Sequence, residues 1–575
     1  MSISANFPNL KPSFLADFSN SQVLDSRITF SRSTTAPYYD GKTSVLAEQN
    51  LLLQSNTFSN AAWVATSATI ASGVTDPAGG TTAFSMTATA GNATLYQTLT
   101  LTATAYTESI WIQRVTGTGT INLTLDGSTL SPVTITGSWA KYTYTATPSA
   151  GSKTIGIQIV TSGDAINIYG SQLENRSSAT ATNITTTTAL TNYIPQLLTA
   201  PINAPRFDFN PTTGESLGLL IEQSSTNLLT YSQLFSDATW LKFRTSITQT
   251  ANIAPDGTQT AQLLVEDATN NTHGCANYGS QTVTSGQQYT FSAEVKAWTR
   301  NYVTLFADVG SALLGNAGVQ FSLIDGTVQK NTNGYVTTST NLGNGWWRFS
   351  YTATATASGN AKSGIYIGSI PATSAANGID TYTGNGYSGI YIWGAQLEAL
   401  AFPTSYVATT SAQVTRASDN ASMTGTNFSS WYNQGQGTWY INATTIWNNS
   451  VPANIPATGW IWVGVASGNF TAPVYTNSAT NSIYTYDGVT ASGVTNPPFG
   501  SKMQVSTSYG SLGKNLLVNG GSASNSTYGN GFGNETILYI GANNGGNSQI
   551  NARISKLAFY SQQLTVAQQQ ALTGT

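Results

Sequence analysis

Hydrophobic and polar residues alternate along the chain in short runs, and turn-forming residues separate these runs. The run at residues 437–443 (GTWYINA) shows this alternation, and 460–464 is similar. Residues 516–518, which enter an Asn-Gly turn, and 554–560 are also expected to be strands. A period of two predicts β-strands, because successive side chains of a strand point to opposite faces. One stretch differs: Thr565, with Gln568 three residues later, has capping-box spacing and predicts a short helix at the end of the chain.

Four sequence blocks occur twice, in the same order. They are 50–63 and 227–240 (NLLLQSNTFSNAAW, NLLTYSQLFSDATW), 106–112 and 289–295 (YTESIWI, YTFSAEV), 139–147 and 346–354 (WAKYTYTAT, WWRFSYTAT), and 166–174 and 390–398 (INIYGSQLE, IYIWGAQLE). The offset grows from 177 residues (227 − 50) to 224 residues (390 − 166). A growing offset predicts one β-module built twice with longer loops in the second copy, because solenoid repeats are only about 20 to 50 residues long.

The repeat divides the chain into five segments. We expect residues 1–48 to form N-terminal strands or an attachment segment, and 49–176 to form the first module. Residues 177–204 are rich in Ser, Thr, Ala and Asn and are interpreted as a linker. The second module is expected at 205–413, beginning with a hairpin signal, and a third domain without a repeat at 414–575.

Composition agrees with an almost all-β protein. Only 8% of the residues are charged, against about 25% in an ordinary soluble domain. Aromatic residues make up 11%, which argues for packed cores and against disorder. The net charge is −3 and no run of Lys or Arg occurs, so we expect no nucleic-acid partner. No apolar stretch approaches 18 residues, which predicts no membrane insertion.

Several of these segments resemble a known family. Residues 24–33 (LDSRITFSRS), 205–222, the two NLL…W blocks and 414–419 (VTRASD) resemble tailed-phage and prophage virion proteins with carbohydrate-binding-like jelly-roll modules. Residues 517–520 (LVNG) and 554–560 (ISKLAFY) resemble the laminin-G/concanavalin-A-like sandwich. The resemblance covers most of the chain. It implies an all-β fold of two duplicated jelly-roll β-sandwich modules followed by a concanavalin-A-like (laminin-G-like) sandwich, a place on a virion, and a glycan-facing role.

Strand parity identifies the first candidate glycan-binding residues. In the repeated Trp strand, Trp346 and Arg348 lie opposite the apolar side, and Trp139 and Lys141 are their counterparts in the first copy. An indole ring can stack on sugar C–H groups while Arg or Lys binds hydroxyls or acidic sugars. The alternative is that both tryptophans fold under a loop as core lids.

The last strand of the second module supplies two further candidates. Tyr391 and Trp393 share one side of this strand and could line a concave glycan-binding face. The competing interpretation is that they pack against the linker or a neighbouring subunit.

Acidic residues predict little chemistry. Glu174 and Glu398 end the repeated blocks and are weak candidates for Ca²⁺ ligands, against ordinary hydrogen bonding at a module end. His273 and Cys275, each unique in the chain, are expected in a loop and are too few for a zinc site. No pair of carboxylates stands out for glycan hydrolysis, so we expect no catalytic residue and no enzymatic activity.

These observations predict a phage virion protein, a fibre or spike that attaches to host-surface glycans. We expect it to be made in the host cytoplasm, released in the virion by lysis, and assembled as a homotrimer with other virion proteins as partners. Two alternatives stay open: a capsid or tail decoration protein with a purely structural role, and a polysaccharide depolymerase.

Overall fold

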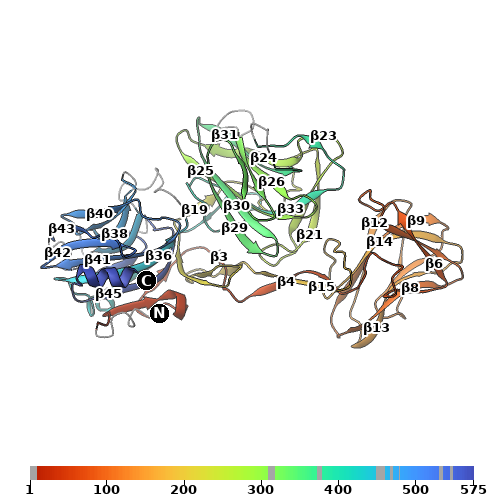
Figure 1. Ribbon diagram of the computed structural model, residues 1–575, viewed down its shortest axis with the longest axis horizontal. Coiled ribbons are helices and arrows are strands. Elements are labelled where there is room, and N and C mark those ends of the chain that lie inside the picture. The colour runs from red at the N-terminus through yellow and green to blue at the C-terminus, as the bar shows by residue number, and fades with distance from the viewer. Residues whose placement is uncertain are drawn as a thin grey trace.

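The computed structural model describes residues 10–574 except 308–316, 372–377, 448–459, 467–469, 478–479, 530–531, 533–534 and 544–547. Strands make up 52% of the protein and helices 3%. Three β-sandwiches lie along the long axis, with the first module at one end, the second module in the middle and the third domain at the other end (Figure 1). The predicted all-β fold class is confirmed.

Two five-stranded sheets form the first module. Its strands are β5 (Val64–Thr66), β6 (Ala68–Val74), β7 (Ala83–Ala88), β8 (Ala93–Leu101), β9 (Tyr106–Thr116), β10 (Ile121–Thr124), β11 (Ser131–Val133), β12 (Ala140–Ala146), β13 (Gly151–Ile159) and β14 (Ala165–Glu174). One sheet has the order β12-β9-β14-β7-β6 and the other β11-β10-β13-β8-β5. Alternate residues such as Ile110 and Ile112 of β9 meet Ile155 and Ile157 of β13 in the core between the sheets.

The second module repeats this arrangement with longer sheets. Its strands are β20 (Trp240–Phe243), β21 (Thr245–Asn252), β22 (Ala261–Glu266), β23 (Asn270–Asn271), β24 (Gly274–Val283), β25 (Gln288–Ala297), β26 (Tyr302–Ala307), β27 (Ala317–Ser322), β28 (Val328–Asn331), β29 (Val336–Gly343), β30 (Trp346–Thr354), β31 (Gly359–Gly368), β32 (Tyr382–Thr383) and β33 (Gly389–Glu398). The sheet orders are β20-β24-β31-β26-β27-β28 and β21-β22-β33-β25-β30-β29. The additional strands β28 and β29 lie at the sheet edges, and β23 pairs with β32 in a separate ribbon.

Matching hydrogen bonds confirm the duplication. The indole Nε1 of Trp63 donates to Gln54 O at 3.0 Å, and that of Trp240 donates to Tyr231 O at 3.1 Å. Trp63 immediately precedes β5 and Trp240 begins β20, the first strand of each module. The two modules are therefore one fold built twice.

The third sandwich is assembled from distant parts of the chain. Its strands are β1 (Phe14–Asp17), β2 (Thr29–Ser31), β17 (Phe207–Phe209), β18 (Ser216–Ile221), β35 (Asn420–Thr424), β36 (Gly437–Thr445), β37 (Trp460–Ala466), β38 (Phe470–Asn477), β39 (Ser482–Tyr486), β40 (Ala491–Thr495), β41 (Lys502–Gly510), β42 (Gly513–Val518), β43 (Ser524–Ser526), β44 (Ile537–Ile540) and β45 (Ala552–Tyr560). One sheet has the order β17-β18-β45-β36-β41-β42-β43, with β1 also on β45, and the other β2-β35-β44-β37-β38-β39-β40.

These pairings differ from the segments expected from the sequence. The N-terminal strands β1 and β2 were assigned to a separate segment, and β17 and β18 to the second module. All four belong to the third sandwich, because their apolar residues, such as Phe14 and Ile221, join its core. The two modules are thus insertions into the third sandwich.

Paired ribbons connect the sandwiches. β3 (Ala36–Tyr38) pairs with β16 (Leu198–Ala200), and β4 (Ser44–Asn50) pairs with β15 (Leu190–Pro195). We call these two ribbons the neck; β3, β4 and β15 run between the first module and the rest of the molecule in Figure 1. A third ribbon, β19 (Ser225–Asn227) with β34 (Val414–Arg416), closes the base of the second module. Residues 190–195 and 198–200 of the expected linker 177–204 therefore form strands, because they pair with the ribbons' partner strands β4 and β3.

Five buried charged residues form ion pairs next to these ribbons, and we call them the buried ion cluster. Arg32 Nη1 lies 2.9 Å from Asp419 Oδ1, Arg206 Nη2 lies 2.8 Å from Glu222 Oε2, and Arg416 Nη2 lies 3.5 Å from the same oxygen. Arg206 also pairs with Asp419. All five residues are at most 2% exposed. They lie in or beside the segments that resemble the virion family, so those motifs have a structural role here.

The helices are short. They are α2 (Phe18–Ser21), α3 (Thr426–Ser429) and α4 (Val566–Thr573). Thr565 caps α4 and forms a capping box with Gln568, which confirms the predicted C-terminal helix. Within the described residues, no helix has the length and apolarity needed to cross a bilayer.

Candidate functional site

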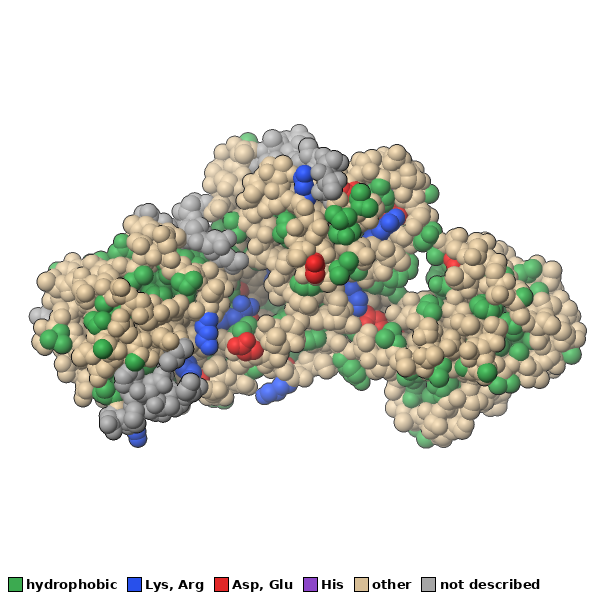
Figure 2. All heavy atoms as spheres, viewed as in Figure 1, with side chains coloured by type: hydrophobic (Ala, Val, Ile, Leu, Met, Phe, Trp, Pro, Cys, Tyr) green, Lys and Arg blue, Asp and Glu red, His purple; other side chains and the backbone are tan. Residues whose placement is uncertain are grey.

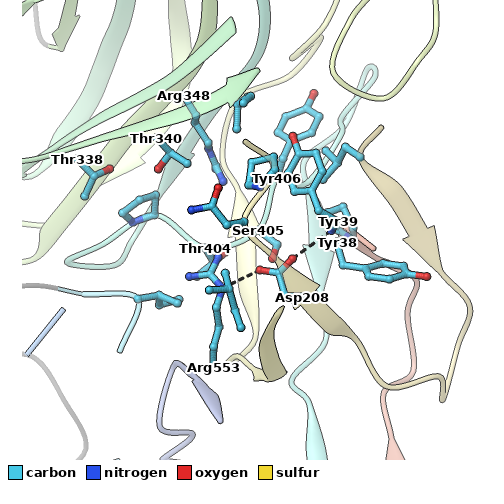
Figure 3. Close-up of a pocket in the computed structure, with 18 of the residues that line it drawn as sticks. Tyr38, Tyr39, Asp208, Thr338, Thr340, Arg348, Thr404, Ser405, Tyr406 and Arg553 are labelled. Carbon is cyan, nitrogen blue, oxygen red and sulfur yellow. Dashed lines mark hydrogen bonds and ion pairs between the residues drawn. The ribbon is translucent and has the colours of Figure 1, made fainter. Parts of the chain in front are cut away.

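A cleft of about 430 Å³ opens where the second module, the neck and the third sandwich meet. We call it the junction cleft. On the face shown in Figure 2 charged side chains are few, and several of them lie where the second module meets the third sandwich. Uncharged side chains and backbone cover most of the surface. The residues labelled in Figure 3 are Thr338, Thr340 and Arg348 of the second module, Tyr38 of the neck with the adjoining Tyr39, Thr404, Ser405 and Tyr406 of the segment after β33, and Asp208 and Arg553 of the third sandwich.

Arg348 projects from β30 into the cleft (Figure 3). Its Nη2 donates to Ser292 Oγ at 3.1 Å, and its Nε lies 3.3 Å from Glu294 Oε1. Burial raises the pKa of Glu294 to about 8, although Arg348 acts to lower it. Burial therefore disfavours the ionised form of Glu294, which weakens its pairing with Arg348.

Asp208 organises the opposite wall. Its Oδ2 accepts a hydrogen bond from Arg553 Nε at 2.7 Å, and its Oδ1 accepts one from the backbone N–H of Tyr39 at 3.1 Å (Figure 3). Asp208 is 4% exposed, whereas the side chain of Arg553 is 31% exposed. This pairing joins the neck to β17 and β45.

Aromatic rings and hydroxyl groups complete the cleft. Tyr38 and Tyr39 are half-buried, Tyr406 is buried, and Thr340 is exposed on β29. Tyrosine offers an apolar ring with a polar end, and hydroxyl groups both donate and accept hydrogen bonds. Together with Arg348, this set can bind the apolar and hydroxylated faces of a sugar.

Trp346 does not contribute to a surface site, which corrects the sequence-based assignment. Parity places it opposite the core residues Phe349 and Tyr351, as expected. That outer face of the sheet is covered by the neck, however, and Trp346 is 0% exposed in a second cluster with Ala47 and Ile194. The sequence predicted its side of the strand correctly and its environment incorrectly.

Tyr391 and Trp393 are buried in the same second cluster, so they form no open binding face. Their exposed fractions are 4% and 1%. Trp393 packs against Tyr406 with ring centroids 4.8 Å apart, and its Nε1 donates to Thr260 Oγ1 at 2.9 Å. The competing interpretation, packing against connecting segments, describes both residues.

In the first module, Trp139 and Lys141 lie away from the junction cleft. Trp139 is half-buried, and its Nε1 donates to Thr75 O at 3.2 Å. Lys141 Nζ donates to Thr180 O at 2.7 Å, and burial lowers the pKa of this amine to about 8. Both polar groups therefore have intramolecular partners.

Glu174 and Glu398 are buried at equivalent module ends. Glu174 Oε2 accepts from Gln172 Nε2 at 2.7 Å and from Thr180 N at 2.8 Å. Glu398 accepts from Thr404 N at 3.0 Å and from Ser225 Oγ at 2.6 Å. Among the described residues, no group of three or more His, Cys, Asp or Glu could hold a metal ion. Both carboxylates are therefore engaged in protein hydrogen bonds at the positions where calcium had been considered.

His273 and Cys275 are not in an open loop. His273 is buried beside β24, with Nδ1 2.9 Å from Arg244 O. Cys275 lies within β24, where burial raises the pKa of its thiol to about 12. Both side chains are therefore enclosed by the protein.

A second cleft of about 370 Å³ adjoins the first and shares Pro37, Leu197 and Tyr406 with it. Trp393 and Arg416 also line this second cleft.

Sequence reasoning missed most of the junction cleft. Asp208 belonged to the hairpin signal at the start of the second module, and Tyr39 to the expected N-terminal segment. These signals were correct for local structure but held no sign that the segments meet. The cleft forms only where remote strands come together, so no local pattern could have identified it.

Comparison with known proteins identifies no family. No family model and no curated protein matches the chain. Among solved structures, the chain is similar to the CBM22-1–CBM22-2 tandem domain of Paenibacillus barcinonensis Xyn10C (10% identity, 62% of this chain and 98% of that one, TM-score 0.19). It is also similar to domains LG4-5 of the mouse laminin α1 chain (12%, 52% and 92%, TM-score 0.15) and to Trypanosoma rangeli sialidase with the inhibitor DANA (10%, 94% and 98%, TM-score 0.22).

The sialidase matches correct one expectation. The sequence led us to expect no enzymatic activity, whereas several of the matched structures are of one enzyme, the Trypanosoma rangeli sialidase. At TM-scores of 0.21 to 0.22 these matches assign no reaction and no catalytic residue to this chain.

Proposed function

We propose that this protein is a tailed-phage virion component, a fibre or spike, that attaches to host-surface glycans through the junction cleft. The observation that carries the glycan part is the cleft itself, where Arg348, tyrosine rings and hydroxyl groups from three parts of the fold meet. The virion part rests on the resemblance of residues 24–33, 205–222 and 414–419 to virion proteins. On this proposal the chain is made in the host cytoplasm and released by lysis.

The cleft chemistry suits a carbohydrate better than an apolar ligand. A drug-like apolar site is lined mainly by hydrophobic groups with few polar ones. Here the hydroxyl groups of Thr338, Thr340 and Ser405 line the same cleft as Tyr38 and Tyr39. Sugars present hydroxyl groups and C–H faces together, which this mixture can match.

Filling the cleft tests the proposal. Thr340 is exposed and lines the cleft, so Thr340→Trp should block it without disturbing the core. We expect binding to host cells and to a glycan array to be lost, with unchanged melting. The matched control is Thr282→Trp, an exposed threonine on β24 in the other sheet of the module.

Unchanged glycan binding by Thr340→Trp would show that the cleft is not the site. If the unmodified chain binds no glycan, and labelled particles show it lying flat on the capsid or tail, the chain is a decoration protein instead.

We further propose that the virion form is a homotrimer in contact with other virion proteins. Single lectin-like sites bind weakly, and linking several raises the affinity by roughly 10²–10⁴ when the geometry permits. Light scattering on assembled material tests this proposal, since a monomer mass there would contradict it.

A further inference from the structure

We infer that the junction cleft selects acidic glycans, with the guanidinium of Arg348 pairing with the carboxylate of a uronic or sialic acid unit. This inference rests on the proposed glycan-binding function and specifies its ligand class. Two observations support it: the acidic residues of the cleft are already paired, and the guanidinium of Arg348 is partly exposed.

The acidic residues of the cleft already have partners. Asp208 is paired with Arg553 at 2.7 Å. Glu222 belongs to the buried ion cluster, in which three arginines face two carboxylates, so that cluster has an excess positive charge of one. Among the described lining residues, these acids therefore present little uncompensated negative charge to a ligand.

Arg348 has donors to spare. Its Nη2 donates to Ser292 Oγ, whereas its Nε, 3.3 Å from Glu294 Oε1, makes no hydrogen bond to any atom that the structure describes. Its side chain is 17% exposed and lines the cleft. A partly exposed, planar guanidinium is well suited to a carboxylate, which accepts two parallel hydrogen bonds from it.

Glu294 has its own place beneath Arg348. Gly394 has φ +61°, and a Cβ at this position would lie 1.7 Å from Glu294 Oε2. The glycine thus leaves room for a 2% exposed carboxyl whose Oε2 has no hydrogen-bond partner among the described atoms. Desolvation disfavours ionisation of such a group, so it does not neutralise Arg348 as an exposed glutamate would.

The first module serves as an internal comparison. Lys141 takes the place of Arg348 and Trp111 the place of Glu294. The Lys141 amine donates to Thr180 O at 2.7 Å, and the Trp111 indole donates to Thr182 Oγ1 at 2.9 Å. These groups are satisfied within the chain, so we assign the acidic-glycan site to the second copy only.

The experiment measures binding of the full-length chain to two pairs of probes: oligogalacturonate against its carboxyl-reduced form, and sialyllactose against lactose. We expect an acidic member to bind at least about tenfold more tightly, because a charge-assisted hydrogen bond is lost in the neutral form. Arg348→Gln should remove this preference, so that the acidic and neutral members of each pair bind with similar affinity.

Two further variants keep the result interpretable. Arg348→Gln with Glu294→Gln replaces the ion pair by two amides and guards against loss of the fold through an unpaired Glu294. Lys330→Gln makes the same charge change on β28, in the other sheet, and should keep the acidic preference.

The possible outcomes are distinct. Equal binding of acidic and neutral probes by the unmodified chain, or an acidic preference that survives in the folded double variant, would overturn the inference while the glycan-binding function stands. Absence of binding to all the probes and to a broad glycan array would instead count against the proposed function.

Discussion

Equivalent residues of the two modules have different surroundings. Trp139 and Trp346 occupy the same place in the repeat, yet the first is half-buried beside Thr75 and the second is fully enclosed by the neck. The difference arises because the neck crosses the outer sheet face of the second module. A residue's role here depends on what its module is packed against.

This contrast gives a stability prediction. Trp346→Ala should lower the free energy of unfolding of the second module by about 3–5 kcal/mol, because it leaves a large cavity. Trp139→Ala should cost about 1 kcal/mol or less, since a partly exposed side chain loses fewer contacts. Denaturant unfolding followed by tryptophan fluorescence measures both. Similar losses for the two variants would contradict the burial of Trp346.

Glu108 is a second residue whose environment is unusual. It is 0% exposed in the core of the first module, at the position that Phe291 occupies in the second. Neither of its oxygens has a hydrogen-bond partner among the described atoms, and burial raises its pKa well above the usual value.

The raised pKa predicts a pH-dependent stability. Protonated Glu108 makes its full contribution to the free energy of unfolding below the pKa of about 4.3 that a glutamate has in the unfolded chain. This contribution is lost as the pH rises through the raised pKa of Glu108 in the folded protein. Glu108→Leu should therefore raise the melting temperature more at about pH 8 than at about pH 4. Differential scanning calorimetry measures the gain, with the exposed Glu215→Leu as control. An equal gain at both pH values would mean that ionisation of Glu108 is not the cause.

At the level of elements, one asparagine ties together the ends of each module. Asn50 Oδ1 accepts from Leu52 N at 3.1 Å and Leu173 N at 3.2 Å, and its Nδ2 donates to Ser171 O at 3.0 Å and Asn183 O at 2.7 Å. Asn227 makes the same four bonds, to Leu229, Leu397, Ala395 and Val407. Both repeats therefore begin with an asparagine at the point where a strand ends and a loop begins.

Removing either asparagine should loosen its own module. We expect Asn50→Ala and Asn227→Ala each to cost about 3 kcal/mol, because buried backbone groups lose their partners. Hydrogen exchange should increase in β14 for the first variant and in β33 for the second. Increased exchange in both modules for one variant would show that the modules do not unfold separately.

At the scale of the whole molecule, the third sandwich holds the chain together. β45 pairs with β1, β18 and β36, so strands from the beginning, middle and end of the sequence share one sheet. The buried ion cluster lies where these segments leave the sandwich. Both modules depend on this base for their position, and the junction cleft depends on it for its walls.

The discontinuous sandwich predicts how fragments behave. Residues 414–575 alone should fail to fold, because β45 loses two neighbours and the core loses Phe14, Phe18, Leu219 and Ile221. Residues 49–186 contain the complete core of the first module and should fold alone. Circular dichroism and one-dimensional NMR distinguish the two results. A cooperative unfolding transition for 414–575 would show that β1, β2, β17 and β18 are dispensable for folding of the third sandwich.

The sequence by itself determined the strands, the duplication and the terminal helix. Alternation at a period of two and the capping-box spacing are local properties, and the four repeated blocks report a shared fold. Parity also placed Phe349 and Tyr351 inside and Trp346 and Arg348 outside, because strand geometry fixes the side on which each residue lies.

Only the tertiary structure decided what lies against each outward face. The neck buries Trp346, Tyr391 and Trp393, while Arg348, on the same face, borders the open cleft. The third sandwich also draws its strands from segments that the sequence had placed elsewhere. These outcomes depend on contacts between residues hundreds of positions apart, and no local pattern of hydrophobic and polar residues specifies such contacts.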